Sequence, residues 1–273
     1  MRILAILLLG LAAGGCSVVQ IGEKTFLHPD DPPVAAAGEQ APFSISGAGG
    51  TLSGLRIHRP GARSVIFYAG GNDFRVHMSG GKVVRNLPAD ADIIMFDYPG
   101  YGASTGPATI KGTMDSLARV YDLARQNGWL QNRRIVFYGF SLGGFVVART
   151  AAERPADGVV LEASAANVRG WGESFIAWFA RPFVEVRVSP ALQDYDNAAE
   201  LEKAGVPVLL LSGGADEQAS DDLSYALAGE LEEAGVRVTR VNYPGARHGE
   251  IMQQPGFTHD LAGFLGSLSA ARQ

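Results

Sequence analysis

Ser141, Asp216 and His248 each follow a run of residues that predicts a β-strand, and they occur in that order along the chain. A serine hydroxyl is a poor nucleophile until a base removes its proton. Histidine can be that base when a carboxylate holds its other ring nitrogen. Because parallel strands end at the same edge of a sheet, three strand ends can bring these groups together. The sequence therefore predicts Ser141 as nucleophile, His248 as base and Asp216 as the residue that orients the base.

The predicted nucleophile lies in the pentapeptide Gly-Phe-Ser-Leu-Gly, residues 139–143, between two apolar runs. Residues 135–138 predict a buried strand, and residues 145–148 can continue as a helix. A Gly-x-Ser-x-Gly sequence in this setting indicates a nucleophile elbow, a sharp turn that lifts the serine above the sheet edge. Glycine at the two flanking positions lets the helix pass close to the strand.

Three acidic neighbours compete with Asp216 for the orienting role. Asp221 and Asp222 follow Ser220, a good N-cap residue, so they suit the acidic first turn of a helix. Glu217 is the nearest alternative. We favour Asp216 because it lies in the loop that follows a predicted strand.

The base could also be another of the five histidines. His248 is favoured because it lies in a glycine-flanked loop after the last predicted strand. The others fall in a predicted tether, on an edge strand, beyond a glycine-rich loop and at the start of the last helix: His28, His58, His77 and His259. Of these, His77 could reach the site.

An oxyanion needs two fixed N–H donors. The backbone N–H of Leu142, directly after the nucleophile, is the first candidate. The second is expected in the Ala-Gly-Gly-Asn loop at residues 69–72, with Gly71 the best candidate. The alternative is that this loop is a plain glycine turn.

Strands and helices alternate from about residue 50 to the end of the chain, which predicts a mainly parallel sheet with helices on both faces. An antiparallel edge strand is expected at residues 52–57. The predicted buried strands are 64–68, 92–97, 135–138, 158–162, 206–211 and 236–241. Ligand sites in such sheets lie at the carboxyl ends of the strands.

Residues 166–200 interrupt this alternation. Trp171, Phe175, Trp178 and Phe179 follow a helical spacing and form an apolar stripe. The stripe is either a core-facing helix or a small lid whose aromatic residues line an acyl pocket. In the second case Trp171, Phe175 and Trp178 are candidate pocket residues, and the pocket would suit a lipid-like acyl chain.

The N-terminus resembles a bacterial lipoprotein signal peptide over residues 1–15. Arg2 precedes an apolar run too short to span a bilayer, and small residues lead to Cys16, the only cysteine. The resemblance implies that Cys16 becomes the lipidated first residue and anchors the protein to a membrane. An ordinary secretory signal, with Cys16 incidental, is the alternative. Residues 16–42 contain four prolines and predict a tether, followed by one domain at 43–273.

The composition supports a large core and argues against nucleic acid as a partner. The chain has 273 residues, of which 47% are hydrophobic, and a net charge of −5. Phosphate binding requires clustered Lys and Arg, and no basic cluster occurs.

Several segments resemble the α/β-hydrolase superfamily, in its Bem46 or serine-aminopeptidase-like branch, over roughly residues 45–270. The segments are 68–72, the Asp-Tyr-Pro-Gly-Tyr-Gly-Ala-Ser sequence at 97–104, 139–144, 213–217 and 247–249. The family usually has His-Gly-Asn where this chain has Ala-Gly-Gly at 69–71. The 97–104 loop is expected to be mainly a structural turn, with Tyr98 as a candidate pocket residue.

The resemblance implies the α/β-hydrolase fold and a serine hydrolase that cleaves carboxylic esters or thioesters through an acyl-enzyme, without cofactor or metal. A serine peptidase of the same fold and a non-catalytic binding protein are the alternatives. With the signal sequence, the resemblance implies a lipid-anchored protein of the bacterial cell envelope, on the periplasmic face of the outer membrane.

Overall fold

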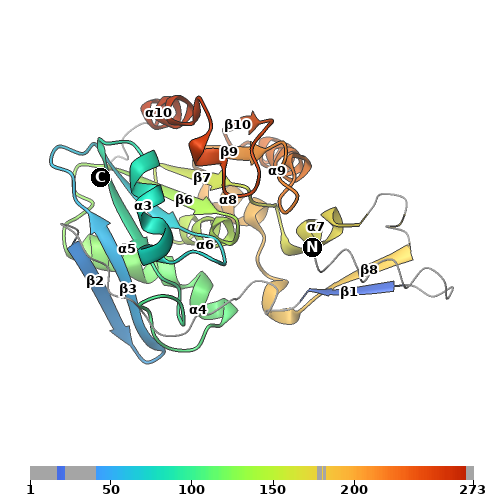
Figure 1. The fold of residues 1–273 in the computed structure, drawn as a ribbon, viewed down its shortest axis with the longest axis horizontal. Helices are drawn as coiled ribbons and strands as arrows, with labels where there is room; N and C mark the ends of the chain where they lie inside the picture. The colour runs from blue at the N-terminus through green and yellow to red at the C-terminus, as the bar shows by residue number, and fades with distance from the viewer. Residues whose placement is uncertain (1–16, 22–40, 177–179, 181–182, 269–273) are drawn as a thin grey trace.

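A computed structural model gives the fold of residues 17–21, 41–176, 180 and 183–268, which are the residues described below. Its centre is an eight-stranded sheet with the order β10-β9-β7-β6-β4-β5-β3-β2 (Figure 1). The strands are β2 (Ala41–Gly47), β3 (Gly50–Ile57), β4 (Ser64–Ala69), β5 (Ala91–Phe96), β6 (Arg134–Phe140), β7 (Gly158–Glu162), β9 (Val208–Gly213) and β10 (Val238–Tyr243).

The six strands from β10 to β5 are parallel, which confirms the predicted mainly parallel sheet. The two remaining strands, β3 and β2, are antiparallel. The prediction that residues 52–57 form the edge is wrong. Strand β2 pairs along the outer side of β3 and takes the edge position itself, beginning at Ala41.

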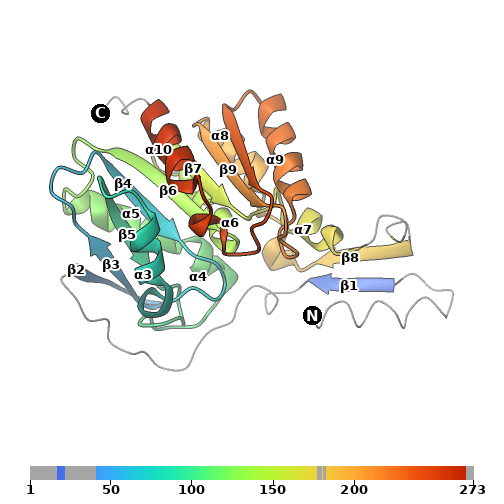
Figure 2. The same cartoon turned by 45° about the horizontal axis from the view of Figure 1, so that its top comes forward.

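Helices cover both faces of the sheet (Figures 1 and 2) because the central strands are buried on both sides. One face packs against α3 (Val76–Asn86), η4 (Ile251–Gln253) and α10 (Phe257–Ser267). The other face packs against α4 (Ile110–Met114), α5 (Ser116–Gln126), α6 (Leu142–Ala151), α8 (Asn197–Ala204) and α9 (Asp221–Glu233). These two apolar layers hold the strand ends that carry the candidate site.

A second, two-stranded sheet lies beside the main one (Figure 2). Strand β1 (Ser17–Ile21) runs parallel to β8 (Val184–Val188). Val186 and Val188 are buried in the domain core, so β8 is anchored there and β1 pairs on β8. Part of the predicted tether is therefore a strand. Residues 1–16, which include the predicted signal peptide and Cys16, lie outside the described residues, as does 22–40.

The predicted aromatic helix of residues 171–179 is shorter than expected. Helix α7 (Val168–Ser174) ends before Phe175. The Ser174 hydroxyl donates to the Trp171 carbonyl at 2.7 Å, the acceptor that a continuing helix would use. Trp178 and Phe179 lie outside the described residues. A short 3-10 helix, η3 (Pro190–Leu192), follows β8. Among all described residues, no helix is long and apolar enough to cross a membrane.

Candidate active site

Ser141 stands in a strained turn between β6 and α6. Its backbone angles are φ 52° and ψ −115°, a sparsely populated positive-φ conformation that costs a non-glycine residue about 1–3 kcal/mol. The Ser141 N–H donates to the Glu162 carbonyl at 2.8 Å, which ties the turn to β7. The predicted strand–turn–helix arrangement of the elbow is therefore present.

The two flanking glycines are required by close backbone contacts. A Cβ atom on Gly139 would lie 2.4 Å from the carbonyl oxygen of Gly143. A Cβ atom on Gly143 would lie 2.0 Å from the carbonyl oxygen of Ala69, at the end of β4. Any larger side chain at either position would push α6 away from the strands and move the serine.

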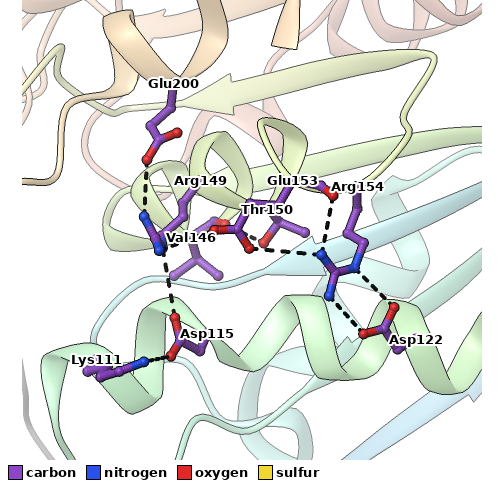
Figure 3. Close-up of polar contacts among 9 residues, drawn as sticks. All are labelled: Lys111, Asp115, Asp122, Val146, Arg149, Thr150, Glu153, Arg154 and Glu200. Carbon is purple, nitrogen blue, oxygen red and sulfur yellow. Dashed lines mark hydrogen bonds and ion pairs between the residues drawn. The ribbon is translucent and has the colours of Figure 1, made fainter. Parts of the chain in front are cut away.

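Ion pairs fix α6 on its outer side (Figure 3). Arg149 lies 3.2 Å from Glu200 on α8 and 3.8 Å from Asp115, which links α4 to α5. Just beyond the helix, Arg154 contacts Asp122 on α5 at 2.9 Å. These contacts are partly exposed, so each contributes little alone, but together they join α6 to its neighbours.

Asp216 and His248 form the predicted acid–base pair in space. His248 Nδ1 lies 2.8 Å from Asp216 Oδ2, and the Asp216 side chain is fully buried. The other carboxylate oxygen accepts N–H bonds from Gln218 and Ala219 at 2.8 and 2.9 Å. Three bonds thus fix the carboxylate, which can hold the ring so that Nε2 faces outward.

The rival acids are placed elsewhere. Glu217 and Asp222 are exposed, and Asp221 contacts Arg240 at 2.9 Å. Of the rival histidines, His58 lies 3.1 Å from Asp92 at the opposite end of the strands, and His77 is exposed on α3.

His248 packs against the residue before the nucleophile. The Phe140 and His248 rings lie 4.9 Å apart between centroids. Within the described part of the chain, no hydrogen bond joins the Ser141 hydroxyl to the His248 ring, whose partner is Asp216. Such bonds are often long without substrate and tighten in the reacting complex. Ser141 and His248 line two neighbouring cavities that share Asn72 and Gln218.

The predicted oxyanion donors lie beside the serine. Leu142 begins α6, and its N–H is at the helix N-terminus, where no intrahelical acceptor is available. A Cβ atom on Gly71 would lie 3.5 Å from the Cβ of Ser141, so the glycine loop passes against the nucleophile. Asn72, which sequence reasoning did not single out, follows Gly71 and lines both cavities.

Tyr98 is not a pocket residue, contrary to the sequence prediction. Its side chain is 1% exposed, and its hydroxyl donates to the Gly70 carbonyl at 2.7 Å. Asp97 accepts N–H bonds from Val76 and Ala103 at 2.8 and 2.9 Å. The 97–104 loop is therefore a structural turn, as expected, and Tyr98 holds the glycine loop in place beside Ser141.

The cavity at Ser141 is small, about 50 Å³. Leu142, Phe145, Ser164 and Trp171 contribute to its walls, so the predicted pocket role of Trp171 agrees with its position. Phe175 does not line this cavity but packs edge-on against Trp171, with 5.0 Å between ring centroids. Trp178 lies outside the described residues.

A larger cavity of about 200 Å³ adjoins His248 and contains a buried acid, Glu162, at the end of β7. Glu162 is 2% exposed, and the Tyr138 hydroxyl donates to its Oε2 at 2.7 Å. Burial raises the pKa of Glu162 from 4.5 to about 7. Sequence reasoning placed Glu162 in a buried strand without noting that a carboxyl there would need a partner.

The model of a known protein family, described as the alpha/beta hydrolase fold, matches residues 65–204, about half of the chain. The chain belongs to the α/β-hydrolase family. A protein of Mycobacterium tuberculosis, MT2364, is 23% identical to this α/β-hydrolase over 248 residues, covering 88% of this chain and 85% of the relative.

Solved structures share the fold. The Pyrococcus furiosus esterase Pf2001 superimposes with a TM-score of 0.68 at 18% identity, covering 87% of this chain and 99% of the esterase. The Pyrococcus horikoshii acylaminoacyl peptidase superimposes with a TM-score of 0.59 at 17% identity, covering 84% of this chain and 40% of the peptidase. At these identities the similarity establishes the fold of this α/β-hydrolase.

The elbow contacts predict that Gly143→Ala destabilises this α/β-hydrolase by about 3 kcal/mol or more, because the new Cβ meets backbone that cannot move aside. Urea unfolding measures the change. Gly229→Ala on α9 is the matched control, since a Cβ there meets nothing within 4 Å. That variant should be unchanged or up to about 1 kcal/mol more stable. Equal stability of Gly143→Ala and wild type would contradict the elbow geometry.

The raised pKa of Glu162 predicts a pH dependence of stability. The folded protein keeps a proton that the unfolded chain releases above pH 4.5, so the stabilisation is full below pH 4.5 and is lost as the pH rises through about 7. Between pH 5 and 8 the free energy of unfolding of the wild type should fall by about 2–3 kcal/mol relative to that of Glu162→Gln. The control Glu202→Gln, on the exposed surface of α8, should follow the wild type. If the free energies of unfolding of Glu162→Gln and the wild type changed equally with pH, the raised pKa of Glu162 would be contradicted.

Proposed function

We propose that the protein is a serine hydrolase, similar to the Bem46 or serine-aminopeptidase-like branch, that cleaves carboxylic esters or thioesters through an acyl-enzyme. Ser141 attacks the carbonyl carbon, and His248 takes its proton and passes a proton to the leaving oxygen or sulfur. Asp216 orients His248 and stabilises its charged form. The N–H groups of Leu142 and Gly71 bind the oxyanion. Water then attacks the acyl group, with His248 again as base, and releases the acid.

The observation that carries this proposal is the arrangement of three strand ends. The strained serine turn follows β6, the buried Asp216 follows β9, and His248, bonded to Asp216 at 2.8 Å, follows β10. A strained turn is retained only where the surrounding structure holds it, and such turns cluster at functional sites. A protein that only bound a ligand would not need both a strained serine turn and a histidine oriented by a buried carboxylate.

The size of the cavity at Ser141 supports a short acyl group. Its volume of about 50 Å³ leaves room for only a few water molecules, each of which needs roughly 10–15 Å³ of such space. The described walls thus fit an acetyl-sized group better than the lipid-like chain suggested by the aromatic stripe.

A kinetic comparison tests the proposal. Wild type should hydrolyse p-nitrophenyl acetate, and Ser141→Ala should lose this activity. Asp216→Asn should keep its fold, because the amide oxygen can still accept the loop N–H bonds, but kcat should fall about 10³–10⁴-fold. Glu217→Gln is the matched control and should retain the wild-type rate. Ligand binding without turnover by wild type would favour a non-catalytic binding protein, and an unaffected Asp216→Asn would reject the assigned role.

We further propose that Cys16 carries a lipid that anchors the protein to the outer membrane of a bacterial cell envelope. The support is the signal-like sequence before Cys16 and the position of β1, which starts at the next residue. In bacteria fed labelled palmitate, the wild type should be labelled and recovered with membranes. Cys16→Ala should be neither labelled nor recovered with membranes. Equal labelling of the two proteins, or an unlabelled wild type, would reject the anchor.

A further inference from the structure

The larger cavity lies on the leaving-group side of the proposed reaction. The base that takes the serine proton later gives a proton to the leaving atom, so the leaving group must lie beside it. His248 and Gly249 line the larger cavity, whereas Ser141, Leu142 and Trp171 line the smaller one. The two cavities meet at Asn72 and Gln218. An ester bound across Ser141 would place its acyl group in the smaller cavity and its alcohol in the larger one.

The larger cavity has room for a small alcohol. Its volume of about 200 Å³ holds more than ten water molecules at roughly 10–15 Å³ of such space each. This space accommodates an alcohol of a few carbons with its hydroxyl groups.

A lysine supplies hydrogen-bond donors on one wall. Lys82 is half-buried on α3, and its ammonium donates to the carbonyl of Gly249, directly after the proposed base. An ammonium has three N–H donors, and the Gly249 carbonyl uses one of them. Lys82 is thereby fixed at the cavity, with donor capacity left for a ligand.

A buried carboxyl supplies an acceptor on another wall. Glu162 is bonded through Oε2 to the Tyr138 hydroxyl at 2.7 Å, which leaves Oε1 for a further partner. Burial raises the pKa of this carboxyl to about 7, so near neutral pH it can both accept and donate. Ser79 and Asn72 add further polar groups to the lining.

The balance of charge indicates a neutral ligand. An anion in this cavity would meet the Asp73 carboxylate and the ionised fraction of Glu162, and a cation would meet the Lys82 ammonium. Apolar walls from Phe74 and Met252 complete the lining and suit the C–H faces of a small carbon skeleton. Mixed donors and acceptors on a partly apolar wall match a compound with several hydroxyl groups.

We infer that this cavity is the leaving-group site and that it takes a small, neutral alcohol with several hydroxyl groups, such as glycerol or a small sugar, bound by Lys82 and Glu162. The inference rests on the proposed function, because it assigns one half of the substrate of that reaction. The natural substrate class would be short-chain acyl esters of such alcohols.

Acetate esters that differ only in the alcohol test the inference. The panel is 1-acetylglycerol, propyl acetate, O-acetyl-lactate and acetylcholine, which carry neutral hydroxylated, neutral apolar, anionic and cationic leaving groups. For the wild type, kcat/KM should be highest for 1-acetylglycerol, by about tenfold or more over propyl acetate. Lys82→Met should reduce this ratio about tenfold. Lys203→Met, an exposed lysine on α8, should leave the ratio at its wild-type value.

The ratio of kcat/KM for 1-acetylglycerol to kcat/KM for propyl acetate separates loss of ligand binding from a structural effect of the substitution. Losing the bond to the Gly249 carbonyl can lower the rates for all esters together, but it leaves their ratio unchanged. An unchanged ratio in Lys82→Met, or a wild type that prefers the apolar or a charged ester, would overturn the inference while the proposed function stands. Failure of the wild type to hydrolyse any ester would instead overturn the proposed function.

A second measurement uses the wild type alone and does not depend on the folding of a variant. Acyl-enzyme formed from p-nitrophenyl acetate can pass its acetyl group from Ser141 to the hydroxyl of an added alcohol in place of water, with His248 taking the alcohol proton. At equal concentration, glycerol should capture at least several-fold more acetyl groups than propan-1-ol. Equal capture would contradict a site built for hydroxyl groups.

Discussion

The close approach of α6 to the ends of β4 and β6 is the constraint on which the candidate site depends. Gly143 lies so near the Ala69 carbonyl, and Gly139 so near the Gly143 carbonyl, that no side chain fits at either position. This approach holds Ser141 in a positive-φ conformation that serine does not favour. The two apolar layers on the sheet and the bond from Ser141 N–H to the Glu162 carbonyl keep the turn in place. The energy of packing therefore maintains a local strain at the residue proposed to react.

The groups around the serine are fixed from several elements. Asp216 is held by three bonds, and one of them orients His248. The Tyr98 hydroxyl holds the Gly70 carbonyl, so the glycine loop stays beside the serine. Such fixed donors and orienting groups suit electrostatic stabilisation of an oxyanion, which requires that little moves during the reaction. The two cavities that meet at this point differ in size, so each could hold a different half of the proposed ester.

The sequence predicted the parallel sheet, the turn at Ser141 and the pairing of Asp216 with His248, because these follow from local signals: buried apolar runs, a glycine-flanked serine and polar residues directly after strands. It did not predict that β2 pairs along the outer side of β3 in a hairpin, because residues 41–47 are mostly exposed and include Pro42, so their strand signal is weak. Tyr98 was misassigned because an aromatic residue near a site can face either the pocket or the core, and only its bond to Gly70 decides which. Glu162 and Lys82 line the same cavity from β7 and α3, and their separation of 80 residues along the chain carries no signal of that cavity.

The central claim is that Ser141 is a nucleophile activated by its position. Mass spectrometry of the protein treated with a fluorophosphonate tests it most directly, because the reagent forms a stable bond only with an activated serine. We expect one adduct per chain, located on Ser141, that forms much more slowly in His248→Ala. An adduct on another serine, or equal labelling of Ser141→Ala and the wild type, would contradict it.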